Sequence, residues 1–270
     1  ASGMSSHTPG VTYQWEKSDN GGAVWSTLGG ATSASYTTGL TTYADDHDDQ
    51  YRCQISAVGA ATPATTNAVV LTVQRTFSIT AQPSNATANE GATANFTVTV
   101  STSSGSPTYQ WERSDDGGAN YASIGSATSA TYTTPTLVFA NDNADRYRVV
   151  ASLVGAAASI TSTHGELTVL RVISIGTQPA STAVIEGGQG TFNIVASITS
   201  GAISYQWQKS INSGANWSNI SGANSATYTT PNTVFPTTPA EQFRCILTNA
   251  NATTVTSTAA TLTVNESEFV

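Results

Sequence analysis

The sequence predicts an all-β chain of three tandem sandwich domains, and two observations lead to that prediction. Trp15, Trp111 and Trp207 stand at a constant interval of 96 residues, and the residues around each of them repeat without a gap. Ser and Thr alternate with Val, Ile and Ala, a pattern typical of half-buried strands, and no segment keeps a helical period. A period near 100 residues is the size of an independent domain and not of a solenoid turn. The chain is therefore a modular array.

The middle repeat is complete, and period-2 alternation together with turn residues defines its strands. Strands are expected at residues 77–80, 94–100, 109–112, 121–124, 130–133, 147–151 and 165–169. Residues 115–118, Asp-Asp-Gly-Gly, form a turn between two of them, because glycine accepts the positive φ of a tight hairpin. About seven strands is the number that a two-sheet sandwich needs.

Each repeat resembles bacterial and phage immunoglobulin-like domains. A Trp lies on the third strand, Tyr51 and Tyr147 stand two residues before a Cys-equivalent position, and a Leu-Thr-Val strand closes the domain. The resemblance covers nearly the whole chain and implies immunoglobulin-like β-sandwiches, as in surface fibre or decoration proteins of tailed phages. Two features depart from it. The second-strand cysteine is absent, and Phe243 replaces the tyrosine whose hydroxyl would bond back to the backbone.

The two cysteines occupy one position of the repeat. Cys53 and Cys245 are equivalent residues two repeats apart, and Val149 fills the same position in the middle repeat. They cannot pair within a domain, so both are expected to be free and buried. A fold without disulfides can mature in a reducing cytosol.

The domain boundaries are predicted at residues 1–73, 74–169 and 170–264, followed by a C-terminal tail at 265–270. Linkers of about three residues leave little slack, so the domains are expected to line up in a rod. The first domain is expected to lack its N-terminal strands, because the register places the equivalents of Phe77 and Phe96 before residue 1. We expect the native polypeptide to continue on that side; a strand donated by a neighbouring chain is the alternative.

Charge and hydropathy exclude two classes of partner. The formal net charge is −8, and the nine Lys and Arg residues are scattered singly, so no basic stripe exists to bind a phosphate backbone. Nucleic acid is therefore not an expected partner. No apolar run is long enough to cross a bilayer, so membrane insertion is not expected either.

A cluster of acids and amides is the candidate metal site. The candidate calcium ligands are Asp45, Asp46, Asp48 and Asp49 in the first repeat and Asn141, Asp142, Asn143 and Asp145 in the second. Carboxylate and amide oxygens are the ligands that calcium takes. The third repeat carries Pro236 and Pro239 in this loop, so the fold does not require a metal there. The alternative is a solvated loop of turn-forming residues, and no other cofactor is predicted.

Neither the histidines nor the aromatic residues indicate a catalytic or sugar-binding site. His7, His47 and His164 occupy unrelated repeat positions, and no nucleophile stands near them in a catalytic order, so no enzyme is predicted. The recurrent aromatics Trp25, Tyr121 and Trp217 are interpreted as core packing rather than carbohydrate platforms.

Strand parity predicts a pair of facing side chains in each domain. If Trp111 and Val149 point inward, Glu112 and Arg148 point outward across neighbouring strands. Glu16 and Arg52 repeat this arrangement as a surface ion pair, whereas Gln208 with Arg244 keeps only a hydrogen bond.

These features favour a non-enzymatic structural and adhesive display protein, a segment of a virion-surface fibre or of a capsid or tail decoration protein. Its partners would be other virion or surface structural proteins and host-surface glycans, bound weakly at several sites at once. One alternative is a bacterial cell-surface adhesin, stalk or extracellular filament subunit. Another is a carbohydrate-binding accessory region of a larger enzyme. The location follows the function: the virion surface, or the bacterial cell surface.

Overall fold

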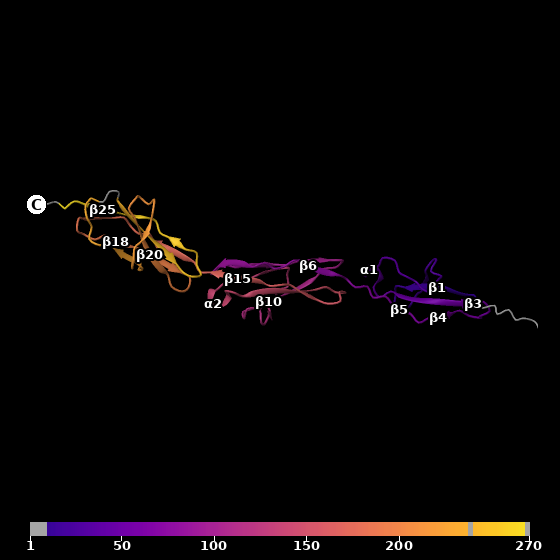
Figure 1. Cartoon of the computed structure of the whole chain (residues 1–270). Coiled ribbons are helices and arrows are strands. Elements are labelled where there is room, and N and C mark those ends of the chain that lie inside the picture. Colours follow the sequence, from indigo (N-terminus) through magenta and orange to yellow (C-terminus); the bar gives the residue numbers. More distant parts are fainter. Residues whose placement is uncertain (1–9, 237–239, 268–270) are drawn as a thin grey trace, which may run out of the picture. The chain divides into compact units, whose positions relative to one another are not determined.

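The computed structural model describes residues 10–236 and 240–267, in which β-strands are the main elements (Figure 1). The strands fall into three successive sets that match the three repeats: β1 to β5, β6 to β15 and β16 to β25. The predicted all-β architecture of tandem immunoglobulin-like sandwiches is confirmed. Within the described residues, no helix is both long and apolar enough to span a membrane.

The first domain has one sheet, in the order β2-β1-β3-β4, with β5 also paired to β3. Its elements are β1 (Val11–Ser18), β2 (Ser26–Thr27), α1 (Tyr43–Asp46), β3 (Gln50–Ala57), β4 (Ala64–Thr65) and β5 (Val69–Val70). In the antiparallel β1–β3 pair, Trp15 lies opposite Cys53 and Glu16 lies opposite Arg52. This register places the tryptophan and the cysteine on one face of the sheet and the predicted ion pair on the other.

The second domain has a sheet in the order β11-β10-β13-β15-β7, with β14 on β13, and two small sheets, β12-β8 and β6-β9. Its elements are β6 (Phe77–Ala81), β7 (Ala86–Asn89), β8 (Asn95–Thr97), β9 (Thr99–Thr102), β10 (Thr108–Ser114), β11 (Ala122–Ser123), β12 (Thr131–Thr133), α2 (Phe139–Asp142), β13 (Arg146–Ser152), β14 (Ile160–Thr161) and β15 (Gly165–Leu170). Strands β7 and β14 and helix α2 were not predicted. The predicted strand at 94–100 is divided into β8 and β9, with Val98 between them.

The third domain repeats the topology of the second: β17-β25-β23-β20-β21 with β24 on β23, and the small sheets β18-β22 and β16-β19. Its elements are β16 (Ile173–Thr177), β17 (Thr182–Ile185), β18 (Thr191–Asn193), β19 (Val195–Ile198), β20 (Ser204–Ser210), β21 (Ser218–Asn219), β22 (Thr227–Thr229), β23 (Glu241–Thr248), β24 (Val255–Thr256) and β25 (Ala260–Asn265). In both domains the closing strand pairs in parallel with an early strand, β15 with β7 and β25 with β17.

The core of each complete domain is centred on the repeated tryptophan. Trp111 and Trp207 are both fully buried, at 0% exposure. Beside them, Phe96 stacks on Tyr147 with ring centroids 4.5 Å apart, and the third domain places two phenylalanines in the same stack at 4.7 Å. Burying aromatic rings of this size supplies a large part of the hydrophobic stabilisation of a sandwich core.

Both cysteines are free and buried, as predicted. Burial raises the pKa of the Cys245 thiol to about 11. Because the thiolate is the reactive form of cysteine, this thiol is inert near neutral pH and serves as a small apolar core residue.

The predicted turn at residues 115–118 is confirmed. Gly117 and Gly118 have φ of 73° and 92°, the left-handed region that glycine accepts without strain. The Ser114 hydroxyl donates to Oδ1 of Asp116 at 2.7 Å and accepts from the Gly118 amide at 2.9 Å. The amide of Asn120 also donates to Asp116, and these bonds lower the pKa of that carboxyl to about 2. The turn is thus fixed by its own side chains.

Each linker contains an arginine with repeated surroundings. The guanidinium of Arg75 lies 3.9 Å from the ring centre of Tyr43, and that of Arg171 lies 3.8 Å from the ring centre of Phe139. The Arg75 amide donates to the Gly155 carbonyl at 2.8 Å. These contacts restrain the linker backbone locally, while the predicted rod stays a prediction.

Candidate functional site: a groove repeated in two domains

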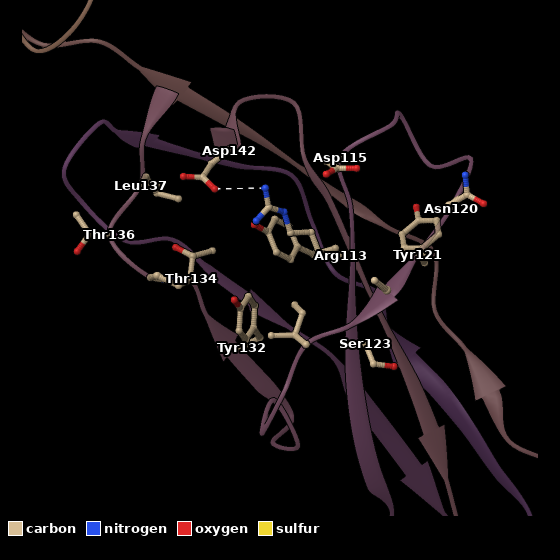
Figure 2. Close-up of a pocket in the computed structure, with 14 residues that line it drawn as sticks. Arg113, Asp115, Asn120, Tyr121, Ser123, Tyr132, Thr134, Thr136, Leu137 and Asp142 are labelled. Atoms are coloured by element: carbon tan, nitrogen blue, oxygen red, sulfur yellow. Dashed lines mark ion pairs between the residues drawn. The ribbon is translucent and has the colours of Figure 1, made fainter. Parts of the chain in front are cut away.

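A groove of about 490 Å³ lies in the second domain, beside the end of β10. Figure 2 shows Asn120 and Tyr121 on one side of it, Thr134 and Thr136 on the other, and Arg113 between them. The lining residues are Arg113, Asp115, Asn120, Tyr121, Ala122, Ser123, Ile124, Tyr132, Thr134, Pro135, Thr136, Leu137, Asp142 and Tyr147. Aromatic rings, hydroxyls, an amide and a paired charge therefore meet in one open hollow.

Arg113, which lines this groove, is held by two carboxylates, and we call the cluster of Arg113, Asp142 and Asp145 the floor of the groove. Nε of Arg113 lies 2.5 Å from Oδ2 of Asp145. Its Nη2 lies 3.5 Å from Oδ1 of Asp142, the contact that the dashed line in Figure 2 marks. The Asp145 side chain is only 3% exposed. Burial raises the pKa of Asp145 to about 6, against the opposing effect of the Arg113 charge. A buried carboxylate needs its partner, so Arg113 is committed to the floor and is not a free cation for a ligand.

The third domain has a smaller groove of about 230 Å³ at the equivalent place. Its lining includes Lys209, Tyr228 and Thr230, which stand 96 residues after Arg113, Tyr132 and Thr134. Lys209 forms an ion pair with Glu241, which occupies the repeat position of Asp145. The groove and its floor are thus features of the repeat and not of one domain.

The first domain keeps the same floor. Nζ of Lys17 lies 2.5 Å from Oδ2 of Asp49 and 3.4 Å from Oδ1 of Asp46. The hydrogen bond to Asp49 raises the pKa of Lys17 to about 12. The same ion pair therefore recurs in all three domains. In each, a Lys or Arg near the end of β1, β10 or β20 pairs with an acid at or directly before the start of β3, β13 or β23, and the sequence spacing between the two residues is constant.

The candidate calcium ligands are divided among several structural tasks. Asp46 and Asp142 accept from the backbone amides of Thr42 and Val138, at the starts of α1 and α2, at 2.7 Å. Asn143 accepts from the Val169 amide at 2.9 Å. Among the residues that the structure describes, no group of three or more His, Cys, Asp or Glu side chains is arranged to hold a metal ion. Calcium binding stays a prediction, and this geometry gives it no support.

The remaining candidate calcium ligands, Asp45, Asn141 and Asp48, lie in the same loops and make other contacts. The Asp45 carboxylate accepts from the Thr42 hydroxyl at 2.7 Å, and Asn141 offers its backbone carbonyl to Arg113 at 2.8 Å. Asp48 is largely exposed and has φ of 69°. The structure therefore brings Asp145 and Asp142 together around Arg113 but leaves Asp45 and Asp48 apart from the floor.

The predicted cross-strand pairs are present. Nε of Arg52 lies 2.7 Å from Glu16, that of Arg148 lies 2.7 Å from Glu112, and Arg244 donates to Gln208 at 2.8 Å. The Glu16 side chain is only 8% exposed, so the description of this pair as a surface pair was wrong. Gln54 also donates to Glu16 at 2.8 Å and helps to cover it.

The interpretation of the recurrent aromatics as core was also wrong for three of them. Trp25, Tyr121 and Trp217 are half-buried beside the two-residue edge strands β2, β11 and β21. Each ring carries an arginine guanidinium on one face: Arg52, Arg148 and Arg244, at 4.0, 3.8 and 4.2 Å from the ring centres. Recurrence at equal spacing shows an equal environment, but not a buried one. Tyr121, backed by Arg148, is also part of the groove wall.

The paired sheets, the buried tryptophans and the repeated groove define a protein of tandem immunoglobulin-like β-sandwich domains. The chain belongs to the family described as "Domain of unknown function (DUF8696)", which matches residues 3–75, 78–171 and 174–266. Among curated protein sequences, none matches this chain.

Solved structures with several immunoglobulin-like domains are similar to this chain at low identity. Extracellular domains 3–5 of Drosophila OTK match 94% of this chain and 85% of their own, with 17% identity and a TM-score of 0.45. The I-band fragment I67–I69 of titin matches 94% and 88%, with 14% identity and a TM-score of 0.49. Three N-terminal domains of the outer capsid protein Hoc of bacteriophage RB49 match 97% and 91%, with 14% identity and a TM-score of 0.35.

Proposed function

We propose that this chain is a non-enzymatic structural and adhesive display protein, a segment of a virion-surface fibre or of a capsid or tail decoration protein. The observation that carries the proposal is the groove, which recurs at the same place in the second and third domains on a repeated scaffold. Weak sites repeated on one chain gain from multivalency, because the second contact forms at a high effective concentration.

The chemistry of the larger groove suits glycans of a host surface. Tyr121 and Tyr132 offer aromatic rings, while Asn120 and the hydroxyl of Thr136 offer hydrogen-bonding groups (Figure 2). Aromatic surface with a few polar groups placed around it is a common composition of a small-ligand site. Arg113 is already paired with Asp145, and the other charged side chains of the lining, Asp115 and Asp142, are acidic, so the groove disfavours anionic ligands and suits a neutral, hydroxyl-rich one.

A glycan-binding screen with matched variants tests this role. Tyr121→Ala removes a groove wall, whereas Trp217→Ala removes the equivalent arginine-stacked ring in the third domain, which does not line that domain's groove. We expect Tyr121→Ala to weaken retention on the preferred glycan about fivefold to tenfold, or about 1–1.4 kcal/mol, and Trp217→Ala to leave it nearly unchanged. Equal losses in both variants, or no glycan retained by the parent chain, would contradict the assignment.

The virion location is tested separately, with an antibody raised against the whole chain. Labelling of purified phage particles in electron microscopy is the expected result. Labelling of bacterial surfaces in the absence of phage would instead support the adhesin alternative.

A further inference from the structure

Each domain has the same tight turn after its tryptophan-bearing strand, and the first domain alone carries Asn-Gly in it. The equivalent pairs are Asn20-Gly21 in the first domain, Asp116-Gly117 in the second and Asn212-Ser213 in the third. Asn-Gly occurs nowhere else in the sequence. Asn20 and Gly21 are both exposed, so water reaches the side-chain amide and the peptide bond that follows it.

Two hydrogen-bond donors hold the side-chain amide of Asn20. The Ser18 hydroxyl donates to Oδ1 of Asn20 at 2.9 Å, and the backbone amide of Val24 donates to the same oxygen at 2.8 Å. Negative charge collects on this oxygen when a nucleophile attacks Cγ, and donors aimed at it stabilise that charge. The turn therefore presents Cγ of Asn20 as an electrophile.

The backbone amide of Gly21 is the adjacent nucleophile. Among the hydrogen bonds of the described residues, none has this amide as its donor, whereas the amide of Gly22 donates to the Ser18 hydroxyl at 2.9 Å. Gly21 has no side chain, and a Cβ added there would meet nothing within 4 Å. Attack of its nitrogen on Cγ of Asn20 closes a five-membered ring, a step within one chain that proximity favours.

Asn212 offers a matched comparison in the third domain. It accepts from the Ser210 hydroxyl at 2.9 Å and from the Asn216 amide at 2.8 Å, the same two kinds of donor that hold Asn20. The next residue is Ser213, whose φ of 54° lies in the same left-handed region as the 70° of Gly21. The two asparagines thus differ mainly in the residue that follows, and the side chain of Ser213 crowds the nitrogen that would attack.

We propose that Asn20 is a site of spontaneous deamidation, a modification that needs water and no enzyme. The Gly21 nitrogen gives up its proton and bonds to Cγ of Asn20, and the side-chain nitrogen takes up a proton and leaves as ammonia. Water then opens the cyclic imide, at Cγ to give aspartate or at the main-chain carbonyl carbon to give isoaspartate. One amide becomes one carboxylate, so the formal net charge of −8 becomes one unit more negative.

The second domain shows that an aspartate fits this turn. Asp116 accepts from the Ser114 hydroxyl at 2.7 Å and from the Asn120 amide at 2.9 Å, the contacts that hold Asn20 in the first domain. The aspartate product therefore keeps the turn, whereas isoaspartate lengthens the backbone and disturbs it. This modification is independent of the groove and of the proposed glycan contacts.

The test uses the whole chain, incubated at mildly alkaline pH and sampled over time by peptide mapping with mass spectrometry. Two reciprocal variants exchange the residue after the asparagine. Gly21→Ser gives the first turn the residue of the third, and Ser213→Gly gives the third turn the residue of the first. Ser213→Gly also guards against a folding defect, because glycine accepts the left-handed φ of that position without strain.

We expect Asn20 to deamidate at least about tenfold faster than Asn212 in the parent chain. Gly21→Ser should slow the reaction at Asn20 to near the rate of Asn212, and Ser213→Gly should accelerate the reaction at Asn212 by a similar factor. Equal rates at the two asparagines of the parent chain would overturn the proposal. So would a rate at Asn212 that Ser213→Gly leaves unchanged.

Discussion

The first and second domains place nearly the same residues at the same repeat positions, and yet one buries them and the other does not. Trp15 and Trp111 lie on equivalent strands, and each donates its indole N–H to a serine carbonyl, Ser33 at 3.0 Å and Ser129 at 2.8 Å. Only Trp111 lies beneath the layer that includes β8. The residue and its hydrogen bond are therefore the same in both domains, whereas its burial depends on the strands that pack over it.

The largest expected difference between the two domains concerns these tryptophans. Trp111→Ala removes a fully buried ring and should cost about 3–5 kcal/mol, enough to unfold a marginal domain. Trp15→Ala should cost about half as much or less, because part of that ring already faces water. Domain-resolved hydrogen–deuterium exchange under increasing urea measures both effects in the whole chain. Equal losses from the two substitutions would show that the first domain is as well covered as the second.

A smaller difference is expected in the response to pH. Burial raises the pKa of Asp145 from an ordinary value of 3.8 to about 6. A raised pKa means that the folded domain favours the protonated acid. The contribution of Asp145 to the free energy of unfolding is therefore fully present below about pH 4 and is lost as the pH rises through about 6. The first domain differs, because there Lys17 has its pKa raised to about 12 by Asp49. That contribution is present below pH 10.5 and is lost only as the pH rises through about 12.

Exchange protection of the second domain should therefore fall between pH 4 and pH 6, after correction for the intrinsic exchange rate. The Asp145→Asn variant should remove most of that slope, because its amide does not titrate. Asp116→Asn is a suitable control, since the pKa of Asp116 is lowered to about 2, outside this range. A slope that persists unchanged in Asp145→Asn would assign the titration to another group.

Much of this fold follows from periodicity and strand parity, but the site does not. Parity alone predicted that Arg148 faces Glu112, because alternate residues of a strand share a face. It could not show that Tyr121 is half-exposed, since burial depends on the tertiary packing around a two-residue edge strand. The acidic loop, taken alone, predicts calcium ligands, because carboxylate and amide side chains cluster in it. The recurrence of Lys209 with Glu241 was the available signal for an ion pair, since a cation precedes an acid at the same spacing in every repeat.

The smallest expected effects separate the three arginine–aromatic stacks. The substitutions Arg52→Ala, Arg148→Ala and Arg244→Ala each remove a cation–π contact, worth about 0.5–1 kcal/mol at an exposed site. Arg148→Ala also removes an ion pair with the partly covered Glu112, worth about 0–1 kcal/mol, whereas Arg244→Ala loses only a hydrogen bond to Gln208.

Arg52→Ala should cost the most of the three, because it leaves the nearly buried carboxylate of Glu16 without its cation and with Gln54 as the remaining side-chain donor. We expect the order Arg52→Ala, Arg148→Ala, Arg244→Ala in lost exchange protection of β3, β13 and β23, with the last near the limit of detection. Adding Glu16→Gln to Arg52→Ala should restore part of the protection, because a neutral amide tolerates the loss of the cation. If that second substitution restores nothing, the cost of Arg52→Ala comes from the stack on Trp25 and not from the unpaired charge.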